Sequence, residues 1–547
     1  MALPTLLLAA SLSLVAAQQR DAPPDVRPAR LSGRVVAADT GKPLPGALVH
    51  LVDLRATNPA QRERRWVTTN AEGRWELTTL SPGRYTLSAS KSGYLKLEYG
   101  QLRPFERGKI LELAAGQTVT VDLTLPRAGA ITGRIVDEFG DPVTAVLVRA
   151  MRYRYVDGQR HLIPLVEGLE VLTNGGGDIT DDLGQFRLYG LTPGDYYVSA
   201  VFTPPGESAT RAGYPPVYYP GTPVVAQARP VAVRIGEEAQ NISFNLLTAP
   251  YSNVSGTIIN SAGSTVKASV NLRAVEAIAV SGESTAATGG DGTFVLSNVP
   301  PGDYRLQVWG VQGPGGVPEF AAMPVTVSGQ DLAGLVVTTL PGATARGRVI
   351  FEEGSRPDAR LFVRAVTTVA GAPTFANTSV GVQPDLTFEL RGLSERQTFR
   401  LGLLPEGWFL KSVTHDGVDI TDAGYDFKPG QQVSGVEIVL TRRATTLTGS
   451  VQDANGAPIG DYTVVAFAAD SAKWGYQTRF VRSARPDQQG GFSIRALPPG
   501  DYLVVALEYV ETGQEFDPEQ LQRWKSLGVP VTLAEGEAKT VTLKLAR

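Results

Sequence analysis

The sequence predicts an all-β protein made of β-sandwich domains joined in tandem. Three observations support this fold class. A short β-like run around a glycine occurs five times, at Gly33, Gly133, Gly256, Gly347 and Gly449. Each copy continues with the same turn motifs in the same order, and the segments between the turns alternate apolar and polar residues. A fixed order of repeated signals indicates a repeat architecture, and short alternating strands between frequent turns are typical of β-sandwiches.

The glycine-containing run opens each copy. The five runs read LSGRV, ITGRI, VSGTI, ARGRV and LTGSV, at residues 31–35, 131–135, 254–258, 345–349 and 447–451. Apolar and β-branched residues flank the glycine in every copy, which favours a strand. We therefore expect each domain to begin with a strand that carries a glycine.

Two aromatic signals follow the opening strand. A polar or glycine-containing turn precedes an aromatic residue in each copy, and a Pro-Gly-x-Tyr motif follows in all copies but the fourth, which has Gln397-Thr398-Phe399 instead. Gly, Pro and Asp are turn residues, whereas large aromatic side chains fill domain interiors. We expect these aromatics to be buried core residues rather than ligand contacts: Trp75, Tyr85, Phe186, Tyr196, Phe294, Tyr304, Phe388, Phe492 and Tyr502.

The last signal is a glycine followed by Gln or Glu, at residues 116–117, 236–237, 329–330, 430–431 and 536–537, before a final alternating strand. Little chain separates each closing glycine from the next opening one, so the linkers are brief and neighbouring domains should lie close together. The predicted division is a signal peptide at 1–17, a linker at 18–29, and five sandwiches at 30–127, 128–249, 250–340, 341–442 and 443–547.

These motifs together resemble the carboxypeptidase regulatory-like domain. The resemblance is closest in copies one, two and five, and it rests on the opening glycine, the PLPGA turn at residues 43–47, the glycine-plus-aromatic turn and Pro-Gly-x-Tyr. It implies five seven-stranded sandwiches of the prealbumin-like (transthyretin-like) type, grouped with carbohydrate-binding-like folds. A fold of this kind carries many functions, so the resemblance alone assigns none.

The amino terminus resembles a secretory signal. An apolar core runs from Leu6 to Val15, and small residues at 15–17 predict cleavage before Gln18. The apolar run is too short to span a bilayer. We therefore expect a secreted, periplasmic or cell-surface protein with no membrane span. The chain has no cysteine, so core burial alone must stabilise the domains, and its net charge of −3 gives no reason to expect a nucleic-acid partner.

The sequence contains no recognisable catalytic or transition-metal site. Zinc carboxypeptidases need a His-x-x-Glu motif, and none of the three histidines, His50, His161 and His415, begins one. They also fall in three different predicted domains, which excludes a shared site within one domain. We predict no enzyme activity, no cofactor and no transition metal. A calcium site made only of carboxylates at residues 178–182 remains open, because Ca²⁺ prefers oxygen ligands.

The candidate ligand-binding residues are Tyr214, Tyr218 and Tyr219, which lie in a Pro-rich insertion of the second copy. Aromatic rings on loops can stack on sugars or peptides. The alternative is that they cover the edge of their own domain, because large exposed apolar clusters are uncommon. A second insertion, at residues 516–524, predicts one short helix from its early proline and the spacing of Leu521 and Trp524.

The function predicted from these observations is a secreted, non-catalytic array of β-sandwiches that acts as a spacer, an adhesion protein or a ligand-binding protein. Its expected partners are a polysaccharide or a surface protein. The alternative is a carbohydrate-binding accessory protein that serves a separate hydrolase. A hydrolase whose site escapes recognition is the third class.

Overall fold

The computed structural model describes residues 27–546, except 55–61, 104, 157–158, 165–176, 203–211, 276–283, 354–359, 368–378, 403, 405–406 and 476–477. Nearly all regular structure in these residues is β-strand, so the predicted all-β class is confirmed. The predicted signal peptide at 1–17 lies outside the described residues. The helix predicted in the last insertion is present as α1 (Pro518–Trp524), and the Asp517 side chain caps its start.

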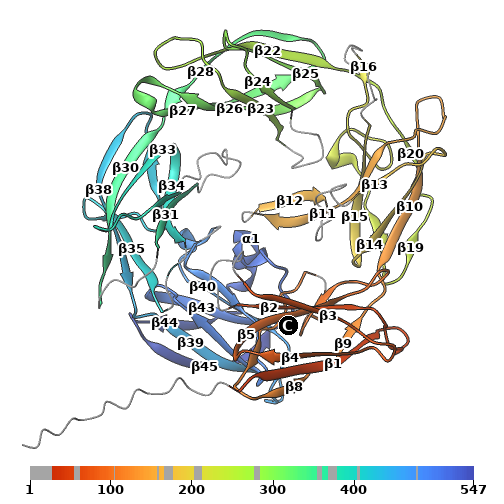
Figure 1. The fold of residues 1–547 in the computed structure, drawn as a ribbon, viewed down its shortest axis with the longest axis vertical. Coiled ribbons are helices and arrows are strands. Elements are labelled where there is room, and N and C mark those ends of the chain that lie inside the picture. The colour runs from red at the N-terminus through yellow and green to blue at the C-terminus, as the bar shows by residue number, and fades with distance from the viewer. Residues whose placement is uncertain are drawn as a thin grey trace, which may run out of the picture.

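The buried apolar side chains form five large clusters, and each cluster belongs to one copy of the sequence repeat. We therefore name the copies by their predicted ranges: repeat 1 (30–127), repeat 2 (128–249), repeat 3 (250–340), repeat 4 (341–442) and repeat 5 (443–547). The exact boundaries stay a prediction. The repeats follow one another around a ring, and repeat 5, in blue, returns to lie beside repeat 1, in red (Figure 1).

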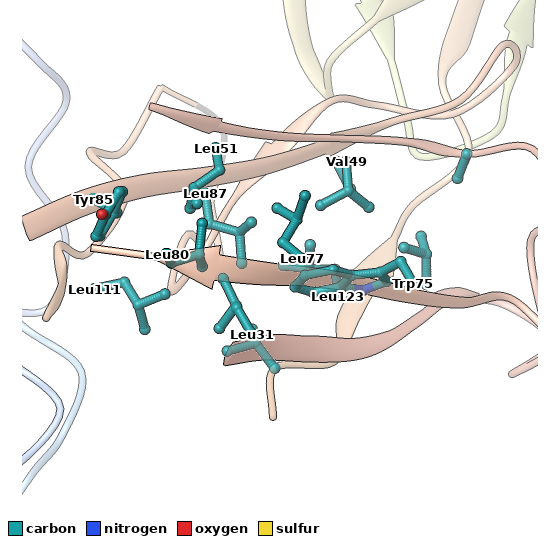
Figure 2. Close-up of a cluster of buried hydrophobic side chains, with 14 of the residues drawn as sticks. Leu31, Val49, Leu51, Trp75, Leu77, Leu80, Tyr85, Leu87, Leu111 and Leu123 are labelled. Atoms are coloured by element: carbon teal, nitrogen blue, oxygen red, sulfur yellow. The ribbon is translucent and has the colours of Figure 1, made fainter. Parts of the chain in front are cut away.

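Repeat 1 is a sandwich of two sheets. One sheet has the order β4-β1-β8, with β9 also paired to β1, and the other has the order β3-β2-β5-β6, with β7 also paired to β5. Leu31 and Trp75 of the first sheet face Val49 and Leu87 of the second across the core (Figure 2). The strands are β1 (Ala29–Ala37), β2 (Leu48–Asp53), β3 (Arg64–Thr68), β4 (Arg74–Leu80), β5 (Gly83–Ser90), β6 (Leu97–Glu98), β7 (Leu111–Leu113), β8 (Thr118–Thr120) and β9 (Leu123–Leu125).

Repeat 2 has the same two-sheet plan. Its sheets have the orders β14-β10-β19, with β20 on β10, and β12-β11-β15-β17, with β13 on β11 and β18 on β15. The hairpin β11–β12 points toward the middle of the ring (Figure 1). The elements are β10 (Gly129–Val136), β11 (Leu147–Val156), β12 (Gln159–Pro164), β13 (Gly177–Ile179), β14 (Gln185–Leu191), β15 (Gly194–Val201), β16 (Ala212–Gly213), β17 (Val217–Tyr218), η3 (Val225–Gln227), β18 (Val231–Val233), β19 (Glu238–Ala239), β20 (Phe244–Asn245) and β21 (Ala249–Pro250).

Repeats 3 and 4 keep the plan with different sheet sizes. Repeat 3 pairs a sheet β25-β22-β28 with a sheet β24-β23-β26-β27-β29, and repeat 4 pairs β33-β30-β38-β35-β36 with β32-β31-β34-β37. The elements are β22 (Ser252–Ile259), β23 (Ser269–Ala274), β24 (Ser284–Ala287), β25 (Thr293–Val299), β26 (Gly302–Gln312), η4 (Pro314–Gly316), β27 (Pro318–Val327), β28 (Leu332–Thr338), β29 (Leu340–Pro341), β30 (Ala343–Phe351), β31 (Phe362–Thr367), β32 (Ser379–Gly381), β33 (Thr387–Leu393), β34 (Glu395–Gly402), β35 (Phe409–His415), β36 (Val418–Asp419), β37 (Tyr425–Phe427) and β38 (Gln432–Thr441).

Repeat 5 shows the seven-stranded form that the resemblance implies. Its strands form the order β41-β40-β43-β45-β39-β42, with β44 on β43, because the long last strand pairs with a strand of each half. A second apolar cluster lies between this sheet and α1, and it includes Phe467, Leu521 and Trp524. The elements are β39 (Thr446–Gln452), β40 (Thr463–Ala468), η6 (Ser471–Lys473), β41 (Val481–Ala484), β42 (Gly491–Arg495), β43 (Gly500–Leu507), η7 (Gln514–Phe516), β44 (Val529–Leu533) and β45 (Ala538–Ala546).

The opening glycine of every repeat lies directly against a backbone carbonyl oxygen near the end of the same repeat. Gly33 lies opposite Trp75 in the sheet. A Cβ atom built on Gly33 would lie 1.8 Å from the carbonyl oxygen of Val121 and 3.2 Å from the Trp75 ring. No side chain fits between these groups, so the position requires glycine. The same collision with the last-strand carbonyl, at 1.9, 2.1, 2.1 and 2.0 Å, is found for Gly133 with Ile242, Gly256 with Leu335, Gly347 with Val436 and Gly449 with Val541.

The repeated aromatics are core residues, as predicted. The ring of the turn motif packs over the opening glycine, and it is at most 3% exposed in all five repeats. The tyrosine of Pro-Gly-x-Tyr is buried as well, and its hydroxyl donates to the carbonyl oxygen four residues earlier. The distances are 2.6 Å for Tyr85, 2.6 Å for Tyr196, 2.9 Å for Tyr304 and 2.7 Å for Tyr502.

The linkers between repeats are held by hydrogen bonds. The Ala128 amide donates to the Gly93 carbonyl at 3.1 Å between repeats 1 and 2. The linker strand β21 pairs with β16, and β29 pairs with β27. Between repeats 4 and 5, the Arg442 amide donates to Glu353 Oε2 at 2.8 Å. Short linkers held in this way fix the orientation of each repeat on the next.

We predict that Gly256→Ala destabilises the protein by about 1–3 kcal/mol, because its Cβ would lie 2.1 Å from the Leu335 carbonyl oxygen, which belongs to a paired strand and cannot move aside. The matched control is Gly290→Ala in the same repeat, where a Cβ atom meets nothing within 4 Å. Thermal unfolding of the full chain measures both variants. Equal transition temperatures for the two would contradict the explanation.

Candidate functional site

The three tyrosines predicted to bind a ligand pack against their own repeat. Tyr218 is 3% exposed and belongs to a small cluster with Met151 and Leu162. Tyr214 and Tyr219 are half-buried beside the core of repeat 2. The Tyr214 hydroxyl donates to Glu138 Oε2 at 3.2 Å. These contacts are those of the alternative in which the rings cover the edge of the domain, and the ligand-binding role of the three residues stays a prediction.

Three segments that are far apart in the sequence meet in the structure, and no motif in the sequence predicts that they do. They are the loop at residues 100–110 of repeat 1, the hairpin β11–β12 of repeat 2 and the segment at residues 508–517 of repeat 5 (Figure 1). We call the place where they meet the junction. It is where the last repeat of the chain contacts the first, so it closes the ring.

Arg485 is the most buried cation of the junction. Its side chain is 6% exposed and forms an ion pair with Glu106 of repeat 1, whose side chain is 0% exposed. Its Nη2 atom also donates to Asp461 Oδ1 at 2.6 Å and to the Gly100 carbonyl at 2.8 Å. A charge removed from water needs a partner and further hydrogen bonds. Arg485 thus binds repeat 5 to repeat 1 through both a charge and a backbone contact.

Further polar contacts surround this pair. Arg107 Nη2 lies 3.1 Å from Oε1 of Glu515, whose side chain is 2% exposed. Arg103 pairs with Glu508 on the exposed side, and Lys109 Nζ donates to the Gly460 carbonyl. Burial lowers the pKa of Lys109, and the nearby Arg485 charge lowers it further. The side chains of the repeat 1 loop that make polar contacts to repeat 5 therefore include Arg103, Glu106, Arg107 and Lys109.

Phe105 connects all three repeats. Its carbonyl oxygen accepts from the Thr512 amide at 3.1 Å and from the Thr512 hydroxyl at 3.0 Å. The guanidinium groups of Arg152 and Arg154, on β11 of repeat 2, lie 4.6 and 3.8 Å from the centre of its ring, which is cation–π geometry. Phe105 has a positive φ of 60°, an unusual conformation for a bulky residue. With this backbone conformation, the ring of Phe105 contacts repeat 2 and its carbonyl oxygen contacts repeat 5.

Repeat 2 also contacts repeat 5 directly. Arg154 Nε lies 2.7 Å from Glu511 Oε1, although the N–H bond does not point along this line, so the contact is an ion pair without hydrogen-bond geometry. Gly513 lies close to the backbone of Tyr155, where an added Cβ atom would be 3.0 Å from the carbonyl oxygen. Burial raises the pKa of the neighbouring Tyr509 to about 12. Residues 511–513 of repeat 5 therefore lie directly against β11 of repeat 2.

A cavity of about 290 Å³ lies beside the junction, between repeats 1 and 5. Repeat 1 contributes Arg84, Arg107, Gly108, Ile110 and Glu112 to its wall. Three buried polar atoms of its lining residues have no hydrogen-bond partner among the described residues: Thr463 Oγ1, Arg485 Nε and Glu511 Oε1. Repeat 5 contributes the remaining lining residues, which are Thr463, Ser483, Ala484, Arg485, Pro486, Asp487, Gly491, Ser493, Val510, Glu511, Thr512 and Glu515.

Ion pairs join repeat 4 to repeats 3 and 5. Arg479 of repeat 5 binds Asp422 of repeat 4 with Nη2–Oδ2 at 2.8 Å, and both side chains are largely buried. Its Nη1 atom also donates to two backbone carbonyls of repeat 4. Arg305 of repeat 3 lies 3.3 Å from Glu395 of repeat 4. Repeat 4 is therefore bound to both of its neighbours by ion pairs as well as by its linkers.

The histidines lie apart from one another, on β2, β12 and β35. Burial lowers the pKa of His50, and the charges of Lys96 and Arg64 lower it further. His415 packs edge-on against Tyr425 with ring centres 5.2 Å apart. Within the residues that the structure describes, no three His, Asp or Glu side chains gather in the way that metal ligands do. In the same residues, no helix has the length and apolar character needed to cross a bilayer.

A family model of the carboxypeptidase regulatory-like domain matches residues 30–126 and 446–546. These segments are repeats 1 and 5, so the family resemblance inferred from the motifs is confirmed for the two repeats that meet at the junction. The match does not include repeat 2, whose motifs also resemble the family. No curated protein matched the sequence.

Among solved structures, the Bacillus anthracis TIE protein is 16% identical, with a TM-score of 0.16, and the alignment covers 57% of this chain and 51% of that one. The chain therefore spans about half the length of that protein. A streptococcal ancillary pilin is 14% identical over 57% of this chain and 98% of its own, with a TM-score of 0.21. Catechol 1,2-dioxygenase from Acinetobacter is 16% identical over 20% of this chain and 55% of its own, with a TM-score of 0.15. Likeness at this level gives no information on function.

We predict that Arg485→Met destabilises the protein by about 3–5 kcal/mol, because it leaves the Glu106 carboxylate buried without its cation. The double variant Arg485→Met/Glu106→Leu should recover most of the loss, since no charge then remains in the buried site. Chemical denaturation of the full chain measures both variants.

The control for this experiment is Arg348→Met, which breaks a pair with Glu437 whose side chains are 63% and 37% exposed. An exposed pair contributes about 0–1 kcal/mol. If Arg485→Met costs no more than Arg348→Met, the buried pair does not hold repeats 1 and 5 together.

Proposed function

We propose that the chain is a secreted or cell-surface, non-catalytic scaffold whose β-sandwich repeats are locked into a closed ring for adhesion or ligand binding. The observation that carries the proposal is the contact between repeat 5 and repeat 1 through the buried Arg485–Glu106 pair. A closed ring spans a shorter distance than the same five repeats placed end to end. This contact therefore favours a binding role over that of an extended spacer.

The way in which the repeats are joined supports a rigid presentation of surfaces. A partner that contacts two repeats at once loses less binding free energy when the repeats are already correctly placed. The linker pairings and the Arg479–Asp422 and Arg485–Glu106 ion pairs fix these placements before any partner binds. The proposed partners are a polysaccharide or a surface protein.

The exposed aromatic side chains favour a second candidate function, that of a carbohydrate-binding accessory protein. Phe139 is 82% exposed, Trp66 67% and Tyr189 65%, and exposed rings of this kind can stack on sugars. Tyr214, Tyr218 and Tyr219 remain in this proposal as residues of the same repeat as Phe139 and Tyr189.

Retention on insoluble polysaccharides separates the two candidates. If the accessory function is right, the wild-type protein is retained and Tyr189→Ala or Tyr214→Ala elutes early, whereas the control Val418→Ala, at a 63% exposed position of repeat 4, is retained like the wild type. The adhesion proposal instead expects saturable binding to a purified cell-surface protein, or retention on a polysaccharide that Tyr189→Ala and Tyr214→Ala leave unchanged. Binding of neither class would contradict both.

We predict that the purified protein contains no stoichiometric zinc and releases no carboxyl-terminal residue from peptides. The reason is that His50, His161 and His415 lie in different repeats and none begins the His-x-x-Glu motif of a zinc carboxypeptidase. Elemental analysis after dialysis, together with a peptidase assay, measures both. One zinc per chain with peptidase activity would overturn the non-catalytic proposal, whereas calcium alone would leave it intact.

A further inference from the structure

We propose that β28 of repeat 3 (Leu332–Thr338) pairs with β28 of a second copy of the chain, so that two rings join edge to edge. The contact would be antiparallel and two-fold symmetric, and it would join the sheets β25-β22-β28 of the two copies into one continuous sheet. This inference goes beyond the scaffold function and does not depend on it, because the contact lies away from the junction.

β28 is an edge strand whose outer side is open. Among the described strands it pairs with β22 alone. The Thr339 amide, directly after β28, donates to the Ile259 carbonyl of β22 at 2.9 Å. Because the backbone groups of a strand point alternately to its two sides, the amides and carbonyls of Val336 and Thr338 point away from β22. An edge with backbone groups of this kind is a template for a further strand.

Repeat 4 shows that this edge can hold another strand. Its last strand, β38, runs parallel to β30 as β28 runs parallel to β22, and both have a bulge at a glycine, Gly334 with φ of 74° and Gly435 with φ of 75°. Beyond the bulge, β35 pairs antiparallel with β38 from Glu437 to Thr441. Glu437 follows its glycine by two residues, as Val336 does. The edge of repeat 3 therefore has the geometry for an antiparallel strand, and no described strand of the chain occupies it.

The sheet β25-β22-β28 carries no charge, which is the property that a contact between two identical strands needs. None of its residues, at 293–299, 252–259 and 332–338, is Asp, Glu, Lys or Arg. Charged residues on an edge strand oppose pairing, and like charges in facing strands repel one another. β28 lacks this protection, whereas the final segments of the other repeats each contain a charged residue: Asp122, Glu238, Glu437 and Lys539.

The favoured register pairs Val336 of each copy with the partner's Thr338. The backbone groups of both residues point to the open edge, so each of the two symmetric pairs exchanges two hydrogen bonds. Val336 is 66% exposed in the single chain. In the dimer its apolar side chain would lie beside β-branched side chains of the partner, and contacts of this kind stabilise paired strands.

A second copy accounts for both the open edge and the lack of charge. A two-fold contact closes on itself, so two rings form a dimer and not a fibre. β22 and β28 lie on the outer side of the ring, so two rings can meet there without disturbing the junction (Figure 1). A contact between two edge strands is small compared with the ~1,200–2,000 Å² of a stable interface. We therefore expect a weak dimer, and a single ring at low protein concentration.

Sedimentation velocity of the intact chain over a range of concentrations tests the proposal. A reversible dimer should form with a dissociation constant on the order of 10–100 μM. Val336→Lys brings two like charges together at the symmetric contact, so it should weaken the dimer about tenfold or more. Its unfolding temperature should equal that of the wild type, because the side chain is exposed in the single chain.

The matched control is Val295→Lys, on β25 at the other edge of the same sheet, where the side chain is 56% exposed. This variant should dimerise like the wild type. Thr338→Pro removes an amide that points to the open edge, a position where strands tolerate proline. It should also weaken the dimer, and it decides the test if Val336→Lys does not fold.

Three results would overturn the proposal. The first is a monomer at every concentration up to about 1 mM, which is also the result expected if a strand of a different protein occupies the edge. The second is a dimer that Val336→Lys and Thr338→Pro leave unchanged. The third is a dimer that Val295→Lys breaks, because the contact would then involve β25 or the outer face of the sheet rather than the β28 edge.

Discussion

The absence of a side chain at the opening glycine is the constraint on which the rest of the structure depends. In every repeat the carbonyl oxygen of the last strand occupies the space that a Cβ atom would fill, as Val121 does over Gly33. The aromatic of the turn motif packs over the same glycine. The first and last strands of a repeat are therefore in direct contact beneath a buried ring, and the two sheets close around that contact. Because each repeat is closed in this way, its amino and carboxyl ends lie on neighbouring strands, and the next repeat follows after a short linker.

The ring arises from additions to this common unit. The linker strand β29 pairs with β27 of the sheet that it leaves, whereas β21 pairs with β16 in a separate two-stranded sheet. The loop at residues 100–110 and the segment at 508–517 extend beyond the two sandwiches and meet across the junction. Because the Arg485–Glu106 pair is almost fully buried, it favours one arrangement of the two ends and penalises others in which either charge lacks its partner. The same two segments border the cavity between repeats 1 and 5.

Local signals allowed the repeats, their strand pattern and the helix α1 to be predicted from the sequence. Turn residues and alternation act within a few positions, and the burial of Trp75 and Tyr85 follows from them. The junction could not be predicted in this way, because Arg485 and Glu106 are 379 residues apart and residues of these types occur on most protein surfaces. The packing of Tyr218 against Met151 of β11 could not be predicted either, because no local pattern in the Pro-rich insertion indicates this contact.

Small-angle X-ray scattering of the intact chain tests the central claim, that contact between repeats 1 and 5 closes the ring. The chain has no cysteine, so disulfides do not complicate the measurement. The closed ring should give a single compact species whose pair-distance distribution is that of a ring. Arg485→Met should lengthen the maximum dimension, while circular dichroism should show that the repeats keep their strands. Scattering from an extended rod of five units in the wild-type protein would contradict the account.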